Sequence, residues 1–287
     1  MKILITGING QVGHALMREL SDHELIGLTR KDCDLTNPDQ IKQVIDNHQP
    51  ELIINPAAYT NVDQAEDEPE LAFQINRDAP KVMAEKAREY NIPLIHFSTD
   101  YVFDGEKKGT YLETDPTKPL GVYGLSKLAG EKAIQEVGGQ IYIFRTSWVY
   151  SNIGYNFYLT MKRLSQERDE LKVVADQFGV PTSNKFIAKQ IKTIIPQLSD
   201  KNTGIYHLVP FGSCSWYEFA KAIISQSNKK FNLDNLYPIE THEFIMKTKR
   251  PRNSILKNYK IKQTFNLNFV SWTKELEKII TNRSYFN

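Results

Sequence analysis

The first thirteen residues constrain the fold of this chain most strongly. A short run rich in β-branched residues, Lys2 to Thr6, is followed at once by the glycine-rich stretch Gly7 to Gly13, and apolar residues recur at Val12, Leu16 and Leu20. This order predicts a strand, a tight turn and a helix. Glycines in such a turn let the backbone approach a pyrophosphate, whose charge then rests on N–H groups at the positive end of the helix. The spacing is GxxGxxG rather than GxGxxG, and we interpret it as dinucleotide-binding rather than as an ordinary glycine-rich turn.

Further apolar runs alternate with helical segments along the first half of the chain. Besides the first strand, strands are expected at Glu24 to Thr29, Glu51 to Asn55, Ile92 to Ser98 and Ile141 to Thr146. This alternation predicts an α/β fold with a doubly wound, Rossmann-like parallel sheet. The regular alternation fades after Trp148. We therefore expect residues 1–150 to form the NAD(P)-binding domain and residues 151–287 mainly a smaller α+β substrate domain, with segments near 171–209 returning to the first.

The segment from Glu68 to Tyr90 has a helical composition, with an apolar residue at every fourth position. Pro80 is expected to kink or split this helix, because proline lacks the N–H of the helical ladder. Asn76 has two readings. Its amide either braces a cofactor-binding loop or is simply a surface group.

A tyrosine and a lysine four residues apart follow the fourth expected strand. If residues 122–137 are helical, Tyr123 and Lys127 lie one turn apart on the same face. A cation there favours the phenolate and draws the phenol pKa from about 10 toward neutrality, which suits proton donation to a carbonyl oxygen. Thr99, at the end of the preceding strand, could hold that oxygen by a second hydrogen bond.

The same spacing occurs twice more, in Tyr158 with Lys162 and in Tyr217 with Lys221. Context favours the first pair, because ligands bind outside the carboxyl ends of parallel strands and Tyr123 opens its helix directly after such an end. The other segments expected at strand ends are the Gly7 turn, the small residues Ala57-Ala58, which leave room for a flat ring, Ser98-Thr99 and Thr146-Ser147-Trp148.

Two basic residues, Arg30 and Lys31, end the second expected strand. A basic residue at this point suits the 2′-phosphate of NADP, whereas an acidic one suits the ribose of NAD. We expect NADPH, with NADH possible, although two solvated turn residues explain the pair about as well. Asp34 either accepts a hydrogen bond from adenine or is only a loop residue before a helix that starts at Asn37-Pro38.

Composition narrows the class of protein. Hydrophobic residues make up 40% of the chain and charged residues 24%, as in soluble globular proteins. The net charge is +2 and the basic residues are scattered, which argues against a nucleic-acid partner. No apolar run approaches the roughly 18 residues of a membrane span. Neither the two cysteines, Cys33 and Cys214, nor the six histidines have metal-site spacing. A soluble cytoplasmic protein without a metal is expected.

Longer motifs carry a resemblance to a known family. They are GINGQVG at 7–13, NPAAYTNVD at 55–63, STDYVFDG at 98–105, VYGLSKLAGE at 122–131, RTSWVY at 145–150, VVADQFGVPT at 173–182 and RPRNS at 250–254. With these motifs the chain resembles the extended short-chain dehydrogenase/reductases, and among them the dTDP-4-dehydrorhamnose reductase family. The glycine turn and the Tyr/Lys pair occur throughout the superfamily, whereas STDYVFDG, RTSWVY and DQFGVPT are much more specific.

The resemblance implies a reaction and a set of roles. The reaction is reduction of a dTDP-4-keto sugar, dTDP-4-dehydro-β-L-rhamnose, by NADPH or NADH in dTDP-L-rhamnose biosynthesis for surface polysaccharide. Tyr123 would donate the proton, Lys127 would hold the nicotinamide ribose and Thr99 would bind the keto oxygen. Asp100 would contact the sugar, Trp148 would lie against it and Arg250 would face the diphosphate, although the basic run 247–252 also reads as solvated surface. Besides Gly7, Gly13 and Arg30, the implied cofactor contacts are Gly10, Gln11, Val12, Asp34, Leu35, Ala57, Ala58, Thr60 and Phe97.

Two other functions fit the same motifs. One is a sibling reductase that yields a 6-deoxy-talose, since the motifs do not fix the face of hydride attack. The other is a non-catalytic subunit like the regulatory β subunit of methionine adenosyltransferase, against which the joint presence of Thr99, Tyr123 and Lys127 argues. Some family members dimerise through magnesium held by glutamates, one from the first helix. Here that helix reads Gly13-His14-Ala15-Leu16, so a monomer or a homodimer without metal is expected.

Overall fold

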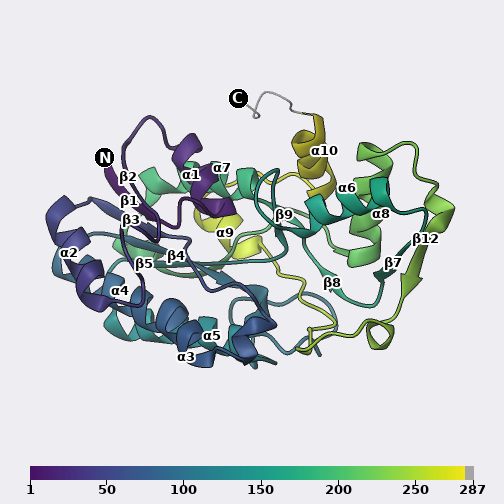
Figure 1. Ribbon diagram of the computed structural model, residues 1–287. Coiled ribbons are helices and arrows are strands. Elements are labelled where there is room, and N and C mark those ends of the chain that lie inside the picture. Colours follow the sequence, from purple (N-terminus) through teal and green to yellow (C-terminus); the bar gives the residue numbers. More distant parts are fainter. Residues whose placement is uncertain (282–287) are drawn as a thin grey trace.

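The computed structural model describes residues 1–281, and its centre is a six-stranded sheet (Figure 1). The strand order is β10-β5-β4-β3-β1-β2, and all neighbouring strands are parallel. These strands are β1 (Lys2–Thr6), β2 (Glu24–Leu28), β3 (Leu52–Asn55), β4 (Leu94–Thr99), β5 (Ile141–Thr146) and β10 (Gly204–His207). The expected doubly wound α/β fold is confirmed, and the five strands expected before residue 150 agree with the structure to within two residues at either end.

Helices cover both faces of this sheet. They are α1 (Gln11–Glu19), α2 (Pro38–His48), α4 (Ala79–Glu89), α5 (Val122–Val137), α7 (Asn184–Ile194) and α9 (Tyr259–Thr264). Successive side chains of a strand point to opposite faces. Ile3 and Ile5 therefore pack with α1, α7 and α9, whereas Leu4 packs with α2, α4 and α5. These two groups of helices lie on opposite sides of the sheet (Figure 1). Each of these strand side chains, fully buried, contributes roughly 1.5–3 kcal/mol to folding.

The segment expected to be one helix from residue 68 to 90 is divided. It consists of α3 (Pro69–Phe73), the π-helical turn η2 (Gln74–Asp78) and α4. Pro80 lies in the first turn of α4 and has no N–H for the carbonyl of Asn76, which explains why the ladder breaks just before it. At this break the chain approaches α5 closely, because a Cβ on Gly130 would lie 2.0 Å from the carbonyl oxygen of Asn76.

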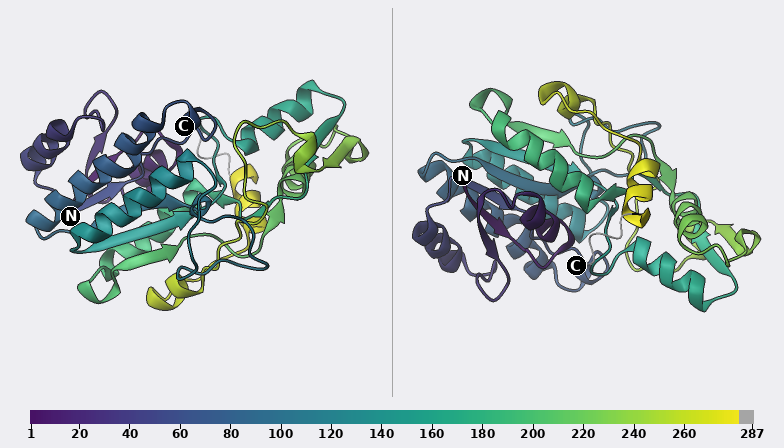
Figure 2. Two further views of the ribbon diagram at one scale, coloured as in Figure 1. Left: turned by 90° about the horizontal axis from the view of Figure 1, so that it is seen from below. Right: turned by 90° about the horizontal axis from the view of Figure 1, so that it is seen from above.

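A second hydrophobic core forms a smaller part at one end of the molecule (Figure 2). Its helices are α6 (Phe157–Glu167), α8 (Trp216–Ser227) and α10 (Trp272–Thr281). Its strands are paired in twos, β6 (Val149–Tyr150) with β9 (Thr182–Ser183), β7 (Leu171–Val174) with β12 (Leu236–Ile239), and β8 (Phe178–Gly179) with β11 (Cys214–Ser215). The short 3-10 helices of the chain are η1 (Gln64–Glu66), η3 (Asp100–Val102), η4 (Ile195–Gln197), η5 (Asp200–Asn202), η6 (Leu233–Asn235) and η7 (Thr241–Glu243).

The segments between residues 171 and 209 divide between the two parts. α7 packs on the large sheet and β10 forms its edge, whereas β7 pairs with β12 in the smaller part. A domain boundary at residue 150 stays a proposal. Within residues 1–281 no helix is both long enough and apolar enough to cross a bilayer.

Candidate active site

A hollow of about 380 Å³ lies at the carboxyl ends of β1, β2 and β3. This is the edge where ligands bind in doubly wound sheets, at the point where the chain turns from one side of β1 to the other. Seven of the residues predicted to bind the cofactor line it, namely Gly7, Arg30, Asp34, Leu35, Ala57, Ala58 and Thr60. The structure thus brings together residues from three separate segments of the chain.

The glycine turn beside this hollow is tightly closed. The N–H of Gly10 donates to the carbonyl of Gly7 at 2.9 Å, and a Cβ on Gly13 would lie 2.3 Å from that same oxygen, so only glycine fits there. No side chain caps the N-terminus of α1, and its first turn holds no acidic residue. The uncapped N–H groups and the positive helix end are therefore suited to a diphosphate.

The two readings of Asp34 are not exclusive. Its Oδ1 accepts hydrogen bonds from the backbone N–H and the hydroxyl of Thr36 at 3.0 and 2.9 Å, as a turn residue does, and these bonds lower the pKa of the carboxyl. The following helix α2 begins at Pro38 behind an Asn37 cap, as expected. Asp34 nevertheless lines the hollow, with Arg30 on the same wall.

Asn76 braces the loop after β3 and is not a surface residue, because it is 0% exposed. Its Oδ1 accepts from the N–H of Tyr59 at 2.9 Å, and its Nδ2 donates to the carbonyl of Tyr59 at 3.1 Å. The same Nδ2 lies 3.0 Å from the hydroxyl of Ser126 on α5. One amide thus joins the loop that lines the cofactor hollow to the helix that carries Tyr123.

Besides Tyr123 and Lys127, the side chains of three further predicted cofactor residues lie outside the hollow. Gln11 Oε1 accepts from Ser151 at 2.7 Å and Asn156 at 3.0 Å. Val12 packs at the border of the sheet core, and Phe97 is buried within that core.

Helix α5 starts where Tyr123 can face the end of β4. Its first N–H groups lack a side-chain cap from their own segment, and the carboxylate of Glu66 supplies one by accepting from the N–H of Val122 at 2.8 Å. The helix spans Val122–Val137, as the sequence predicted. The ring of Tyr101 meets that of Tyr123 edge-on, with centroids 5.7 Å apart.

The expected fall in the phenol pKa is wrong for this structure. Burial raises the pKa of Tyr123 to about 12, and only the nearby Thr99 side chain lowers it. Lys127 is itself buried, which lowers its pKa to about 8. Its Nζ donates to the carbonyl oxygen of Phe97 at 2.6 Å and lies 3.2 Å from His96 Nε2, so its charge is directed toward the strand and not toward the phenol.

Thr99 and Asp100 close the site beside Tyr123. The Thr99 hydroxyl donates to Asp100 Oδ1 at 3.0 Å, and Asp100 is 2% exposed. Burial raises the pKa of Asp100 to about 7. Buried hydroxyls without a hydrogen-bond partner occur at the two neighbouring strand ends, on Ser98 of β4 and Thr146 of β5. Such atoms are costly unless a ligand or water engages them, which fits a polar substrate.

Trp148 packs against the core of the smaller part, whereas Arg250 contacts residues of the larger part. The Trp148 indole is stacked on Trp216, with ring centroids 3.5 Å apart and an interplanar angle of 8°. Arg250 is not solvated surface, because its side chain is only 13% exposed and its Nη2 lies 3.0 Å from Asp63 Oδ1. Its Nη1 is buried without a partner, and its guanidinium stands 5.8 Å from the ring of Tyr101.

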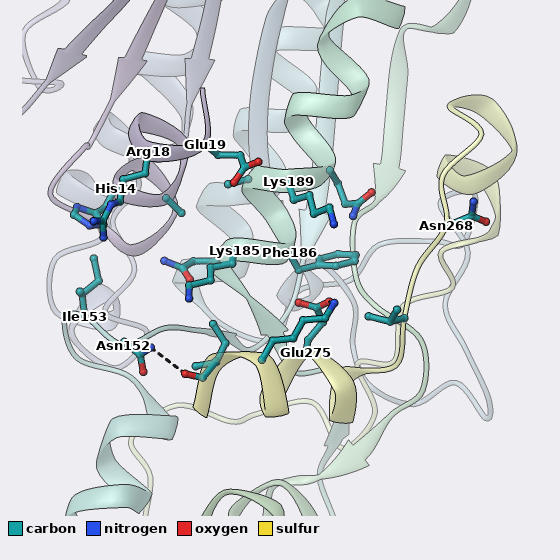
Figure 3. Close-up of a pocket in the computed structure, with 17 residues that line it drawn as sticks. His14, Arg18, Glu19, Asn152, Ile153, Lys185, Phe186, Lys189, Asn268 and Glu275 are labelled. Atoms are coloured by element: carbon teal, nitrogen blue, oxygen red, sulfur yellow. Dashed lines mark hydrogen bonds and ion pairs between the residues drawn. The ribbon is translucent and has the colours of Figure 1, made fainter. Parts of the chain in front are cut away.

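The two other Tyr/Lys pairs lie in the smaller part. Tyr158 is buried in its core, and Tyr217 packs against that core from α8. A further pocket lies between α1, α7 and α10, where His14, Lys185 and Glu275 face one another (Figure 3). It holds none of the predicted site residues. Across residues 1–281, no three His, Cys, Asp or Glu side chains are grouped to bind a metal ion.

Two residues of the site escaped the sequence reasoning. Glu66 caps α5 from 56 positions earlier in the chain, and no pattern of neighbouring residues in the sequence predicts a contact over that separation. His96, the neighbour of Lys127, had a detectable signal. It is a polar residue inside an apolar strand, and its position in the strand directs its side chain to the face that α5 covers.

The comparisons agree with this geometry. Residues 1–284 match the family described as RmlD substrate binding domain. The chain is 39% identical over 284 residues to the dTDP-4-dehydrorhamnose reductase of Burkholderia thailandensis, with 95% of each chain covered. It is 40% identical over 290 residues to that of Escherichia coli, which covers 98% of this chain and 97% of the relative.

A solved structure is similar over almost the whole length. The dTDP-4-dehydrorhamnose reductase of Bacillus anthracis in complex with NADP superposes with a TM-score of 0.91 at 39% identity, covering 97% of this chain and 98% of that one. The resemblance carried by the motifs is confirmed by these matches. The chain belongs to the RmlD family, that of the dTDP-4-dehydrorhamnose reductases.

Proposed function

We propose that the protein reduces dTDP-4-dehydro-β-L-rhamnose to dTDP-β-L-rhamnose with NADPH, the last step of dTDP-L-rhamnose synthesis. The observation that carries this proposal is the position of Thr99 and Tyr123 at the end of β4, with Lys127 bonded to the same strand. The hollow lined by the predicted cofactor residues lies at the same edge of the sheet. Both curated relatives bear the name of this reductase, and the related structure holds NADP.

The cofactor fits the residues that are present. The uncapped end of α1 would hold the diphosphate, and the hollow, which Arg30 lines, would hold the adenosine half. When bound, NADPH supplies the hydride that reduces C4 of the sugar.

Tyr123 donates its proton to the alkoxide oxygen that forms at C4. With a pKa of about 12 the phenol is fully protonated at neutral pH, so it always carries the proton to be given. Lys127 lies one turn further along α5 and holds the ribose of the cofactor with its ammonium group. The hydroxyl of Thr99, which lowers the pKa of Tyr123, is the group that eases proton loss from the phenol.

Thr99 and Asp100 steady the same oxygen. In its protonated form, Asp100 can donate to Thr99 Oγ1 across their 3.0 Å contact, which frees the Thr99 hydroxyl to donate to the ketone. Trp148 lies against the deoxysugar. The unpartnered Nη1 of Arg250 is available to the diphosphate of the substrate, since guanidinium groups bind phosphate oxygens well.

The experiment that tests this function is NADPH oxidation with the keto sugar generated in situ by the upstream enzymes. The loss of NADPH is followed by absorbance, and the product is identified by NMR. Turnover to dTDP-L-rhamnose is the expected result. A 6-deoxy-talose product would identify the sibling reductase instead, and tight NADPH binding without turnover would identify a regulatory subunit.

A further inference from the structure

A row of three polar side chains crosses the apolar sheet at the carboxyl ends of its central strands. Thr6 ends β1, Asn55 ends β3 and His96 lies in β4 as the register partner of Asn55. All three point to the face covered by α5, opposite the face of Ile5, Ile54 and Phe97. Thr6 is 2% exposed, Asn55 1% and His96 0%. Three polar groups buried in this way are costly unless they bond to one another.

Continuous hydrogen bonds join this row to Lys127. Thr6 Oγ1 lies 2.6 Å from Asn55 Oδ1, and Asn55 Nδ2 lies 3.1 Å from His96 Nδ1. His96 Nε2 then lies 3.2 Å from Lys127 Nζ. At its other end, the Thr6 hydroxyl accepts from the N–H of Ala57 at 3.4 Å, in the loop that lines the cofactor hollow.

The chemistry of the row allows two proton arrangements. Burial, with the neighbouring Lys127, holds the pKa of His96 well below its usual range, so the ring is neutral with one N–H and one acceptor nitrogen. If Lys127 is an ammonium, Nε2 must accept from it. The proton is then on Nδ1 and needs the Asn55 oxygen, which the amide offers by rotating its nitrogen toward Thr6.

In the second arrangement the Asn55 nitrogen donates to Nδ1, as the contacts of the structure are arranged. The His96 proton is then on Nε2 and points at Lys127, which accepts it only as a neutral amine. The two arrangements differ by one proton on Lys127, together with the tautomer of His96 and the rotation of the Asn55 amide.

We propose that His96 is a positioning residue that sets the proton affinity of Lys127 through this row, its tautomer changing when Lys127 gains or loses a proton. The inference rests on the role of Lys127 in the proposed function. The Phe97 carbonyl fixes where the amine sits, and the row decides how readily it stays charged. The other charged groups around it are fixed in their own contacts. Glu131 on α5, which raises the pKa of Lys127, accepts hydrogen bonds from Nε and Nη2 of Arg145 in β5 at 2.9 and 2.6 Å. Asp100 accepts a hydrogen bond from the Thr99 hydroxyl.

Proton and nitrogen NMR of the imidazole rings in the unmodified protein tests the tautomer directly. The signals of His96 are identified by their absence in His96→Gln. Between about pH 6.5 and about pH 9.5, a range that brackets the Lys127 pKa of about 8, we expect the ring proton to move from Nδ1 to Nε2 without imidazolium forming. A tautomer that stays the same across this range overturns the proposal.

The pH profile of kcat gives a second readout. In His96→Gln the amide oxygen favours the ammonium, so the alkaline limb should move up by about one pH unit. In His96→Leu the amine of Lys127 loses its hydrogen-bond partner, so the alkaline limb of the kcat profile should move down by about one pH unit. His207→Gln is the matched control, because His207 is equally buried in β10 and bonds to the carbonyl of Lys257 instead. Profiles of both His96 variants that coincide with the unmodified protein contradict the proposal.

Lys127→Met separates this inference from the proposed function. If that variant keeps full kcat, the role of Lys127 itself is wrong. If it loses activity while the His96 variants keep the unmodified profile, only the inference about His96 fails.

Discussion

The indole rings of Trp148 and Trp216 stack at 3.5 Å and are nearly parallel, so the last residue of the RTSW segment is held by the smaller part of the molecule. Trp148 has a left-handed backbone, with φ at +46°, which a bulky side chain rarely adopts. Gly179 of β8 lies behind the ring. Packing on both sides therefore fixes a strained residue at the mouth of the site.

Gly179→Ala tests whether this position serves the sugar. The new Cβ would lie 2.4 Å from Cε2 of Trp148 and must displace the ring. We expect KM for the dTDP-sugar to rise about tenfold, the effect of losing roughly 1.4 kcal/mol of binding, with NADPH affinity unchanged. Phe178→Leu, at an exposed neighbouring position on the same strand, is the control. Unaltered steady-state kinetics in Gly179→Ala would mean that Trp148 does not contact the substrate.

Arg30→Ala tests the cofactor preference. Arg30 lines the hollow and is exposed, so its loss should not disturb folding. If it faces the 2′-phosphate, Kd for NADPH should rise about tenfold while Kd for NADH changes little. Fluorescence titration of both nucleotides measures this, with Lys31→Ala as the matched neighbour. Equal weakening of the two nucleotides would show that Arg30 is only a turn residue.

Asp100→Asn tests whether the buried carboxyl of Asp100 destabilises the folded protein when it is ionised. Because burial raises the pKa of Asp100 in the folded protein to about 7, the folded state holds this proton more tightly than the unfolded state. Its contribution to stability is present at low pH and is lost as the pH rises toward and beyond 7. The asparagine variant should therefore match the unmodified protein near pH 4 and exceed its free energy of unfolding by about 2–4 kcal/mol near pH 8.

Urea unfolding at both pH values measures this difference. If the asparagine variant is less stable than the unmodified protein at the higher pH, the raised pKa of Asp100 is contradicted.

Arg250→Met tests the predicted contact with the substrate diphosphate. Methionine keeps much of the apolar stem, so the main change is the loss of the guanidinium beside Asp63. KM for the sugar nucleotide should rise by about tenfold or more, because charged hydrogen bonds are lost. Arg252→Met, two positions on and exposed, is the control. The same KM in both variants would remove Arg250 from the site.

Local patterns in the sequence were sufficient for the elements that carry the site. The strand Lys2–Thr6 has the predicted limits, because its richness in β-branched residues is a property of consecutive residues. The helix Val122–Val137 has the limits that were assumed for the Tyr123/Lys127 pair. The strand-end argument succeeded for the ends of β1, β2 and β3, whereas Ser98-Thr99 and Thr146 to Trp148 do not line the same hollow. Arg30, Asp34 and Ala57 meet at one hollow because parallel strands bring their carboxyl ends to one edge.

The predictions that failed concern properties that depend on burial in the folded protein. The spacing of Tyr123 and Lys127 correctly placed them on one helix, but it could not show that burial raises the phenol pKa. Nor could it show that Lys127 bonds to Phe97 and His96 of β4. Nor could the sequence show that Asn76, which lies in the π-helical turn before Pro80, accepts a hydrogen bond from Tyr59.

The central claim is that Tyr123 is the proton donor, and kcat of Tyr123→Phe tests it most directly. The phenyl ring keeps the packing against Tyr101 and removes only the hydroxyl. We expect kcat for the keto sugar to fall by about 10² to 10⁴, the usual contribution of a positioned general acid, with NADPH binding intact. Tyr158→Phe, which alters the other buried Tyr/Lys pair, should leave kcat unchanged. Full turnover in Tyr123→Phe would contradict the account.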